Sequence, residues 1–297
     1  MGKKKNRKTA GATPVVTATV APPRPWERPV ACSLMTLLFL GLPLLPWHPL
    51  FFLPPVLYWP VYVGAAAGCW IRFHAGDDAL PRPASVTLES SGLLLIFGSY
   101  FLLKLIGIHP SGTDENIYYY MASRMAEGAI PYRDFFFSHP PVHLLIPTAI
   151  FGITGFSVAV AKAIPVVAQA VAGLFLYLTI RPSSRTFALL ALMLHLTAYQ
   201  VLMGSTDMNG ENLMTAFLMA SMFTAVRGRF LTSGVLAGLG LGCGLYGLAA
   251  VVALAVATAF DSRRSVARYG LGFMAGFGVV MLPFAVLGGS GFVEGVF

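Results

Sequence analysis

Acidic side chains stand in two short polar segments of an otherwise apolar chain. Asp114 and Glu115 follow a Ser-Gly-Thr sequence, and a second segment runs from Asp207 through Met-Asn-Gly to Glu211. A carboxylate held at the edge of a bilayer can act as a general base toward a hydroxyl. At the start of a helix it can instead cap the free backbone N–H groups. Both roles are open for both segments.

Candidate partners for a phosphate lie between these acidic segments. His139 precedes two prolines, which fix the local backbone, and Arg133 precedes it across a run of phenylalanines. Imidazole and guanidinium groups both donate hydrogen bonds to phosphate oxygens. Arg133 could also pair with Asp134, and an exposed pair of this kind stabilises a protein by only about 0–1 kcal/mol. His139 and Arg133 are therefore candidate ligands of an anionic substrate.

The elements around these residues are predicted to be an amphipathic helix and a short apolar piece. Ile117, Met121 and Met125 recur every four residues between Asp114 and Gly128, which predicts a juxtamembrane helix lying on the membrane surface. The apolar piece 142–155 has about 14 residues, whereas a span needs roughly 20. We expect this piece not to cross the membrane.

The rest of the chain has the composition of an integral membrane protein. Of its 297 residues, 56% are hydrophobic and 11% are charged, against roughly a quarter charged in a soluble domain. The predicted fold is an all-α transmembrane bundle of about nine spans. The expected spans are two within 30–73, then 91–108, 158–180, 186–203 and 213–226, two within 229–263, and 269–287. The expected organisation is a basic tail 1–28, a hairpin and loop 29–90, and a core 91–297 with outer loops 109–157 and 204–212.

The basic residues predict the orientation of the bundle. With an alternating path, sixteen of the 20 Lys and Arg residues fall in the tail or at one set of helix ends, and four remain: Lys104, Arg124, Arg133 and Lys162. This positive-inside bias predicts a cytoplasmic N-terminus and outward-facing acidic segments, in an integral protein of the plasma (inner) membrane. The basic residues that give the net charge of +8 lie in the tail and at the ends of apolar stretches. Because membrane orientation explains this placement, we expect no nucleic-acid partner.

Two further patterns bear on packing and ligands. The spaced glycines of the segment 234–244 predict close helix packing, and a path for lipid is the alternative. The cysteines Cys32, Cys69 and Cys243 lie at irregular spacing in apolar segments. They indicate neither a disulfide framework nor a metal site, so no metal or other cofactor is expected.

The order of the outer-loop motifs resembles that of GT-C membrane glycosyltransferases. The sequence Gly112-Thr-Asp114-Glu115 opens a helix, Glu127-Gly-Ala-Ile-Pro-Tyr-Arg133-Asp-Phe-Phe ends it, and His139-Pro-Pro follows. The resemblance covers about 94–260 and is closest to the branch with protein O-mannosyltransferases and the lipid A aminoarabinose transferase. It implies transfer of a sugar from a polyprenyl-phosphate donor to a hydroxyl of a glycan, lipid or protein.

The resemblance also implies roles for individual residues. Asp114 would orient or deprotonate the acceptor hydroxyl, with Glu115 as its neighbour, and His139 would lie near the lipid phosphate. Glu211 falls near the acidic position of the second outer loop of the family, and Asp207 competes with it for this position. The sugar-carrying lipid is then a substrate, and no separate cofactor is implied.

Two departures keep other interpretations open. The segment Leu245-Tyr-Gly stands where the family often has a lysine, and family members usually continue for several helices beyond the position of Phe297. A truncated or degenerate member, acting as a non-catalytic subunit, is therefore the second interpretation. A lipid or solute transporter is the third, because intramembrane ionisable residues mark transport paths. Its candidates are Lys104, Lys162 and His195.

Overall fold

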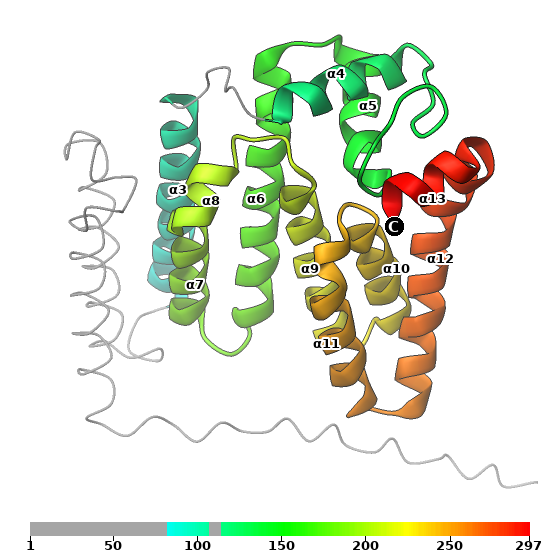
Figure 1. Ribbon diagram of the computed structural model, residues 1–297. Helices are drawn as coiled ribbons and strands as arrows, with labels where there is room; N and C mark the ends of the chain where they lie inside the picture. Colours follow the sequence, from blue (N-terminus) through cyan, green and yellow to red (C-terminus); the bar gives the residue numbers. More distant parts are fainter. Residues whose placement is uncertain (1–81, 107–113) are drawn as a thin grey trace, which may run out of the picture.

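The computed structural model describes residues 82–106 and 114–297, and helices form nearly all of the regular structure there (Figure 1). The helices are α3 (Arg82–Ile106), α4 (Glu115–Ala126), α5 (Val142–Thr154), α6 (Val158–Ile180), α7 (Arg185–Thr197), α8 (Tyr199–Gly204), α9 (Gly210–Val226), α10 (Phe230–Leu241), the 3-10 helix η3 (Leu245–Gly247), α11 (Leu248–Ala259), α12 (Arg263–Gly288) and α13 (Ser290–Val296). In these residues the only β pairing is an isolated bridge between Pro131 and Phe135. The all-helical prediction is therefore confirmed for this part of the chain.

The helices form an up-and-down bundle with α4 lying across one end (Figure 1). Two of them, α6 and α12, are long and apolar enough to cross a membrane, and four shorter apolar helices accompany them. The surface of α12 is itself apolar: Leu271, Met274 and Val286 are 66%, 66% and 81% exposed. These features are those of a helical membrane protein. The total of about nine spans stays a prediction.

Several boundaries differ from the predicted ones. The helix expected at 91–108 begins earlier, at Arg82, and the one expected at 186–203 is divided into α7 and α8 because Ala198 leaves the helical conformation. The helical pair expected between Arg229 and Arg263 is present as α10 and α11. The predicted tail 1–28 lies outside the described residues, and so does most of the segment 29–90.

The spaced glycines pack α10 against α12. A Cβ atom at Gly234 would lie 2.0 Å from the carbonyl oxygen of Tyr269, and one at Gly272 would lie 2.1 Å from that of Leu231. Only residues without a side chain allow two helix backbones to approach this closely. The predicted packing role of this glycine run is confirmed.

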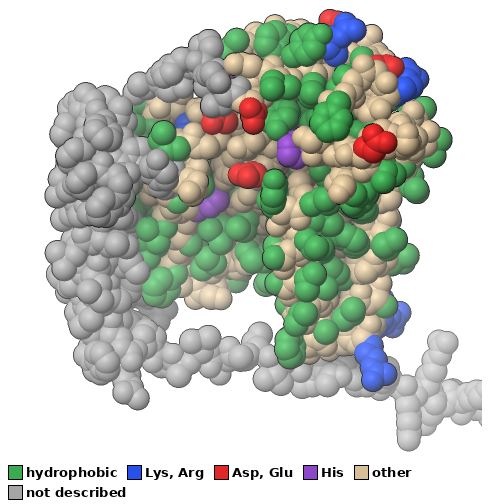
Figure 2. Space-filling model, in the orientation of Figure 1, with side chains coloured by type: hydrophobic (Ala, Val, Ile, Leu, Met, Phe, Trp, Pro, Cys, Tyr) green, Lys and Arg blue, Asp and Glu red, His purple; other side chains and the backbone are tan. Residues whose placement is uncertain are grey.

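Acidic side chains gather toward one end of the bundle. In Figure 2 they lie in the upper half of the face shown, whereas Lys and Arg side chains lie at both the lower and the upper end. Glu89 is an exception at the other end: it is 7% exposed and accepts a hydrogen bond of 2.6 Å from Arg181 Nε. Tyr177 also donates to Glu89, so this carboxylate ties α3 to the end of α6.

The helix α4 confirms the predicted element and part of its predicted apolar face, since Met121 and Met125 pack against the core and Ala122 is fully buried. Glu115, Tyr119 and Ala122 are its buried residues, whereas Ile117, part of the predicted apolar stripe, is 52% exposed. The reason is a buried polar contact beneath Glu115, which fixes the rotation of the helix more strongly than the weak apolar periodicity. The following apolar piece forms the 13-residue helix α5. That this helix does not cross the membrane stays a prediction.

Candidate active site

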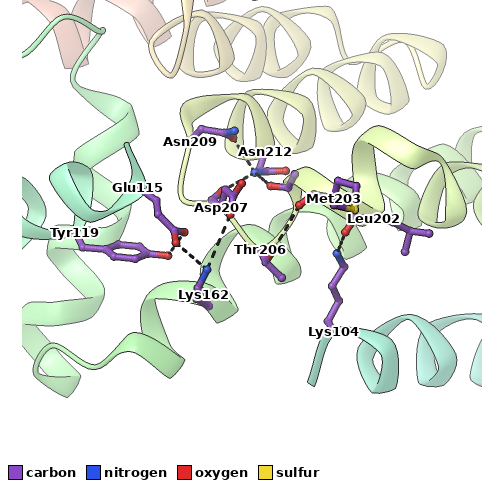
Figure 3. Close-up of polar contacts among 11 residues, drawn as sticks. Lys104, Glu115, Tyr119, Lys162, Leu202, Met203, Thr206, Asp207, Asn209 and Asn212 are labelled. Carbon is purple, nitrogen blue, oxygen red and sulfur yellow. Dashed lines mark hydrogen bonds and ion pairs between the residues drawn. The ribbon is translucent and has the colours of Figure 1, made fainter. Parts of the chain in front are cut away.

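A buried ion pair lies beneath α4. Lys162 Nζ, from the second turn of α6, lies 2.8 Å from Glu115 Oε1, and the two side chains are 2% and 1% exposed. The hydroxyl of Tyr119 donates to the other Glu115 oxygen at 2.7 Å. Asp207 Oδ1 lies 4.0 Å from the same Lys162 nitrogen. Figure 3 shows Lys162 between the two carboxylates, so three separate segments meet at one ammonium group.

The loop that carries Asp207 is held by the buried side chain of Asn212. Its amide nitrogen donates to the carbonyl oxygens of Gly204 and Asp207, each at 3.0 Å, and to Asn209 Oδ1 at 2.8 Å. Its own oxygen accepts a hydrogen bond of 2.8 Å from Gln169 of α6. A buried amide with its donors and acceptor engaged fixes the loop strongly, and it leaves Asp207 facing Lys162.

Asp207 and Lys104 belong to the same polar region. Burial and the charge of Glu115 raise the pKa of the Asp207 carboxyl, while Lys162 and Lys104 oppose this rise. Lys104 is 5% exposed and donates to the carbonyl oxygen of Leu202. Both lysines that sequence analysis placed inside the membrane therefore have polar partners from the described chain.

Asp114 occupies the N-cap position of α4 without acting as a side-chain cap. Its carbonyl oxygen accepts a hydrogen bond of 3.0 Å from the Ile117 N–H, but its exposed carboxylate makes no capping hydrogen bond. Asn209, the N-cap residue of α9, makes none either. Capping therefore accounts for neither acidic segment.

The charges of Asp114 and Glu211 both act on His139. Burial lowers the pKa of His139, and the negative charges of Asp114 and Glu211 oppose this lowering. The two acidic segments, far apart in the sequence, are thus within electrostatic range of one imidazole. Because burial has the larger effect, the pKa of His139 lies below its ordinary value, which favours the neutral imidazole near pH 7.

The His139 ring is held by a tyrosine. Its Nε2 lies 2.9 Å from the hydroxyl of Tyr118, and the ring centroids are 5.7 Å apart. Burial raises the pKa of Tyr118, and the charge of Asp114 and then Tyr246 raise it further. Tyr246 is 72% exposed and lies in the segment Leu245-Tyr-Gly. That segment is therefore close to the same site.

His143 lies below His139 and was not singled out from the sequence. Its ring centroid is 4.5 Å from that of Tyr118 and 5.8 Å from that of His139. Its Nε2 lies 3.3 Å from the Met208 carbonyl oxygen, while Nδ1 has no hydrogen-bond partner among the described residues. Burial lowers the pKa of His143 to about 4, so this ring is neutral and joins α5 to the loop of Asp207.

Arg133 forms an ion pair with Asp134 and not with His139. Its Nε and Nη2 atoms bind the two Asp134 oxygens at 2.8 and 2.9 Å, and both side chains are exposed. Arg133, followed by the Ile130 N–H, lowers the pKa of Asp134 to about 2. The structure shows no contact between Arg133 and His139; instead the Tyr132 hydroxyl donates to the His139 carbonyl oxygen at 2.5 Å. Arg133 therefore takes the alternative pairing open from the sequence.

Comparison with known proteins assigns the chain to a family. A family described as dolichyl-phosphate-mannose-protein mannosyltransferase matches residues 138–287, half of the chain. The chain belongs to this mannosyltransferase family. No curated protein and no solved structure matches it. The expected resemblance to GT-C glycosyltransferases is confirmed, and family membership agrees with the helical membrane architecture.

The matched range divides the candidate residues of this mannosyltransferase-family chain. It contains His139, Asp207 and Glu211, and it begins after Asp114 and Glu115. The catalytic roles expected for the latter two therefore rest on the geometry and on the motif resemblance. Among the residues that the structure describes, no group of three or more His, Cys, Asp or Glu side chains could hold a metal ion.

Glu115 has a different environment from the one expected. It was paired with Asp114 as a second catalytic carboxylate, but its side chain is buried and bound to Lys162 and Tyr119. The signal for this contact was present in the sequence: a lysine within an apolar helix requires a partner, and Lys162 is such a residue. The sequence did not identify which carboxylate it would take.

The buried His143 should make the folded state sensitive to acid. Because its folded pKa of about 4 lies below the ordinary value of 6.5, the unfolded chain binds more protons between these values. Stability present above pH 6.5 should be lost as the pH falls toward 4, by about 3 kcal/mol at 1.36 kcal/mol per pKa unit. Thermal unfolding of the purified protein at several pH values measures this loss.

The variant His143→Phe provides the control, because it keeps an aromatic ring and removes the titrating group. Its stability should fall less between pH 6.5 and 4 than that of the wild type. If the two proteins lose stability in parallel over this range, His143 is not responsible for the sensitivity to acid.

Proposed function

We propose that the chain transfers a sugar from a polyprenyl-phosphate donor to an acceptor hydroxyl at the outer face of the plasma membrane. The observation that carries this proposal is the polar group at His139, which lies 2.9 Å from the Tyr118 hydroxyl and on which the charges of Asp114 and Glu211 both act. Family membership supports a lipid-linked donor, since the family is described by dolichyl phosphate mannose. The positive-inside bias supports the orientation, with the N-terminus cytoplasmic.

Asp114 is the proposed general base. Its exposed carboxylate accepts the proton of the acceptor hydroxyl as that oxygen attacks the anomeric carbon of the sugar. The bond between this carbon and the phosphate oxygen breaks, and the polyprenyl phosphate leaves with the electron pair. The proton therefore ends on Asp114 and the negative charge on the phosphate.

His139 and Tyr118 are the proposed donors to the leaving phosphate. Their polar atoms lie 2.9 Å apart, so one of the two groups donates to the other before the lipid binds, and both can donate to the phosphate once it is present. Hydrogen bonds aimed at the charge that develops on a leaving group stabilise the transition state. His139 performs this role while neutral, because an imidazole N–H donates without a positive charge.

Transfer from a radiolabelled polyprenyl-phosphate sugar by the purified protein tests this function, and His139→Ala tests the donor site. Loss of a hydrogen bond to a charged group costs about 1.5–3 kcal/mol, so the use of the donor should weaken roughly ten- to hundredfold. The expected result is a lower kcat/KM for the donor with little change in the apparent KM for the acceptor. Titration of each substrate separately measures this difference.

Arg124→Ala is the matched control, because Arg124 is an exposed residue of α4 whose partner is the equally exposed Glu127. It should leave both titrations unchanged. Unchanged donor use in His139→Ala would restrict His139 to a structural role. Absence of transfer from any polyprenyl-phosphate sugar by the wild-type protein would contradict the proposed function itself.

A further inference from the structure

We propose that Lys162 is a positioning residue that ties the two outer acidic segments together and so brings Asp114 and Glu211 to one site. The inference rests on the proposed function for its effect on turnover. The tie itself is a structural property, and it can be measured without any sugar transfer.

The geometry at Lys162 Nζ carries the proposal. This atom lies 2.8 Å from Glu115 Oε1 in α4 and 4.0 Å from Asp207 Oδ1 in the loop between α8 and α9. The side chain is 2% exposed, and Figure 3 shows it extending between the two carboxylates. An ammonium group has three donors, so one lysine can serve both segments.

The helix α6 holds the backbone of Lys162 in a fixed position. The Ser157 hydroxyl accepts a hydrogen bond of 3.2 Å from the Val160 N–H and caps the helix just before Lys162. Further along α6, Gln169 holds Asn212, which in turn holds the loop of Asp207. The loop is therefore attached to α6 at two points, and the buried side of α4 is attached at the same end through Glu115.

Each tied carboxylate has a neighbour in the proposed site. Asp114 immediately precedes Glu115, and Glu211 lies four residues after Asp207, in the first turn of α9. Lys162 itself is covered by the buried Glu115 and Tyr119. It acts on the site through these neighbours. Without its charge, Glu115 and Asp207 would face one another as like charges, which favours separation of α4 from the loop.

The test measures two quantities in the intact chain in lipid nanodiscs. They are the distance between α4 and α8 and the rate of sugar transfer. Spin labels replace two exposed residues, Tyr120 of α4 (66% exposed) and Met203 of α8 (52% exposed), after the three cysteines are changed to alanine. In Lys162→Met the distance distribution should shift to longer values and broaden. Turnover should fall about a hundredfold, since small misplacements of reacting groups have effects of this size. Lys162→Arg should keep the wild-type distance and most of the turnover.

The contact of Lys162 with both Glu115 and Asp207 is called the three-way tie. An exchange of charges distinguishes it from a simple Lys162–Glu115 pair. In the double variant Glu115→Lys/Lys162→Glu the pair is restored, but Asp207 then faces a carboxylate, so the distance should stay long. Adding Asp207→Asn should shorten it again. Full rescue by the double variant alone would overturn the three-way tie.

The same measurements remain decisive if a variant fails to fold or if no transfer is seen. Where Lys162→Met does not fold, the charge exchange and the Asp207→Asn addition still test the tie. An unchanged distance in every folded Lys162 variant would overturn the proposal even if turnover fell. Absence of transfer by the wild-type protein would contradict the proposed function, while the distances would still test the tie.

Discussion

Replacing Asp114 by asparagine should reduce sugar transfer by about a hundred- to ten-thousandfold, the usual contribution of a general base. The amide has the shape of the carboxylate but cannot accept the proton of the acceptor hydroxyl. Helix stability should not change, because asparagine occupies N-cap positions as well as aspartate does and the Asp114 side chain makes no capping bond. Initial rates with a polyprenyl-phosphate sugar, compared at equal amounts of folded protein, measure the effect.

Glu127→Gln is the matched control for this variant. Glu127 follows the other end of α4, and its side chain is 62% exposed. Its neutralisation should change the rate little. Near wild-type turnover in Asp114→Asn would remove Asp114 from the mechanism, and an equal loss in both variants would indicate a general effect of surface charge.

Replacing Glu115 by alanine should instead lower stability, by about 3–5 kcal/mol, the cost of removing one partner of a buried ion pair. The side chain is 1% exposed, and its loss leaves the buried Lys162 with Asp207 at 4.0 Å. Tyr119 also loses its hydrogen-bond acceptor. Thermal unfolding in detergent, followed by the loss of helical circular dichroism, measures the change.

A double variant distinguishes loss of the pair from loss of packing. Replacing both charges by apolar residues of similar volume is often neutral, so Glu115→Met/Lys162→Met should recover much of the stability lost in Glu115→Ala. Glu127→Ala, at an exposed position, should have little effect. If Glu115→Ala costs no more than Glu127→Ala, the buried pair does not stabilise the fold.

Much of the architecture follows from the sequence alone. Apolar stretches bounded by Arg181, Arg227 and Arg263 correspond to the helices α6, α9 and α11, because helices in hydrocarbon must satisfy their own backbone hydrogen bonds. The glycine spacing likewise predicted the close contact of α10 with α12. These features depend on local composition and period, which a sequence displays directly.

The choice of candidate residues also followed in part from the sequence. Acidic segments placed at one end of alternating helices were expected on one face, and Asp114 and Glu211 are close enough to His139 for their charges to act on it. The catalytic roles of these residues stay predictions. The family match confirmed the resemblance that suggested them.

Only the tertiary structure decided how adjacent, chemically similar residues divide between surface and core. Asp114 is exposed and Glu115 is buried because successive helical residues point about 100° apart, and the rotation of α4 is set by Lys162, 47 positions later. The same holds for His139 and His143, one at the site and one beneath it. The local sequence pattern predicts that a buried lysine pairs with a carboxylate. The path of the whole chain determines which carboxylate lies beside it.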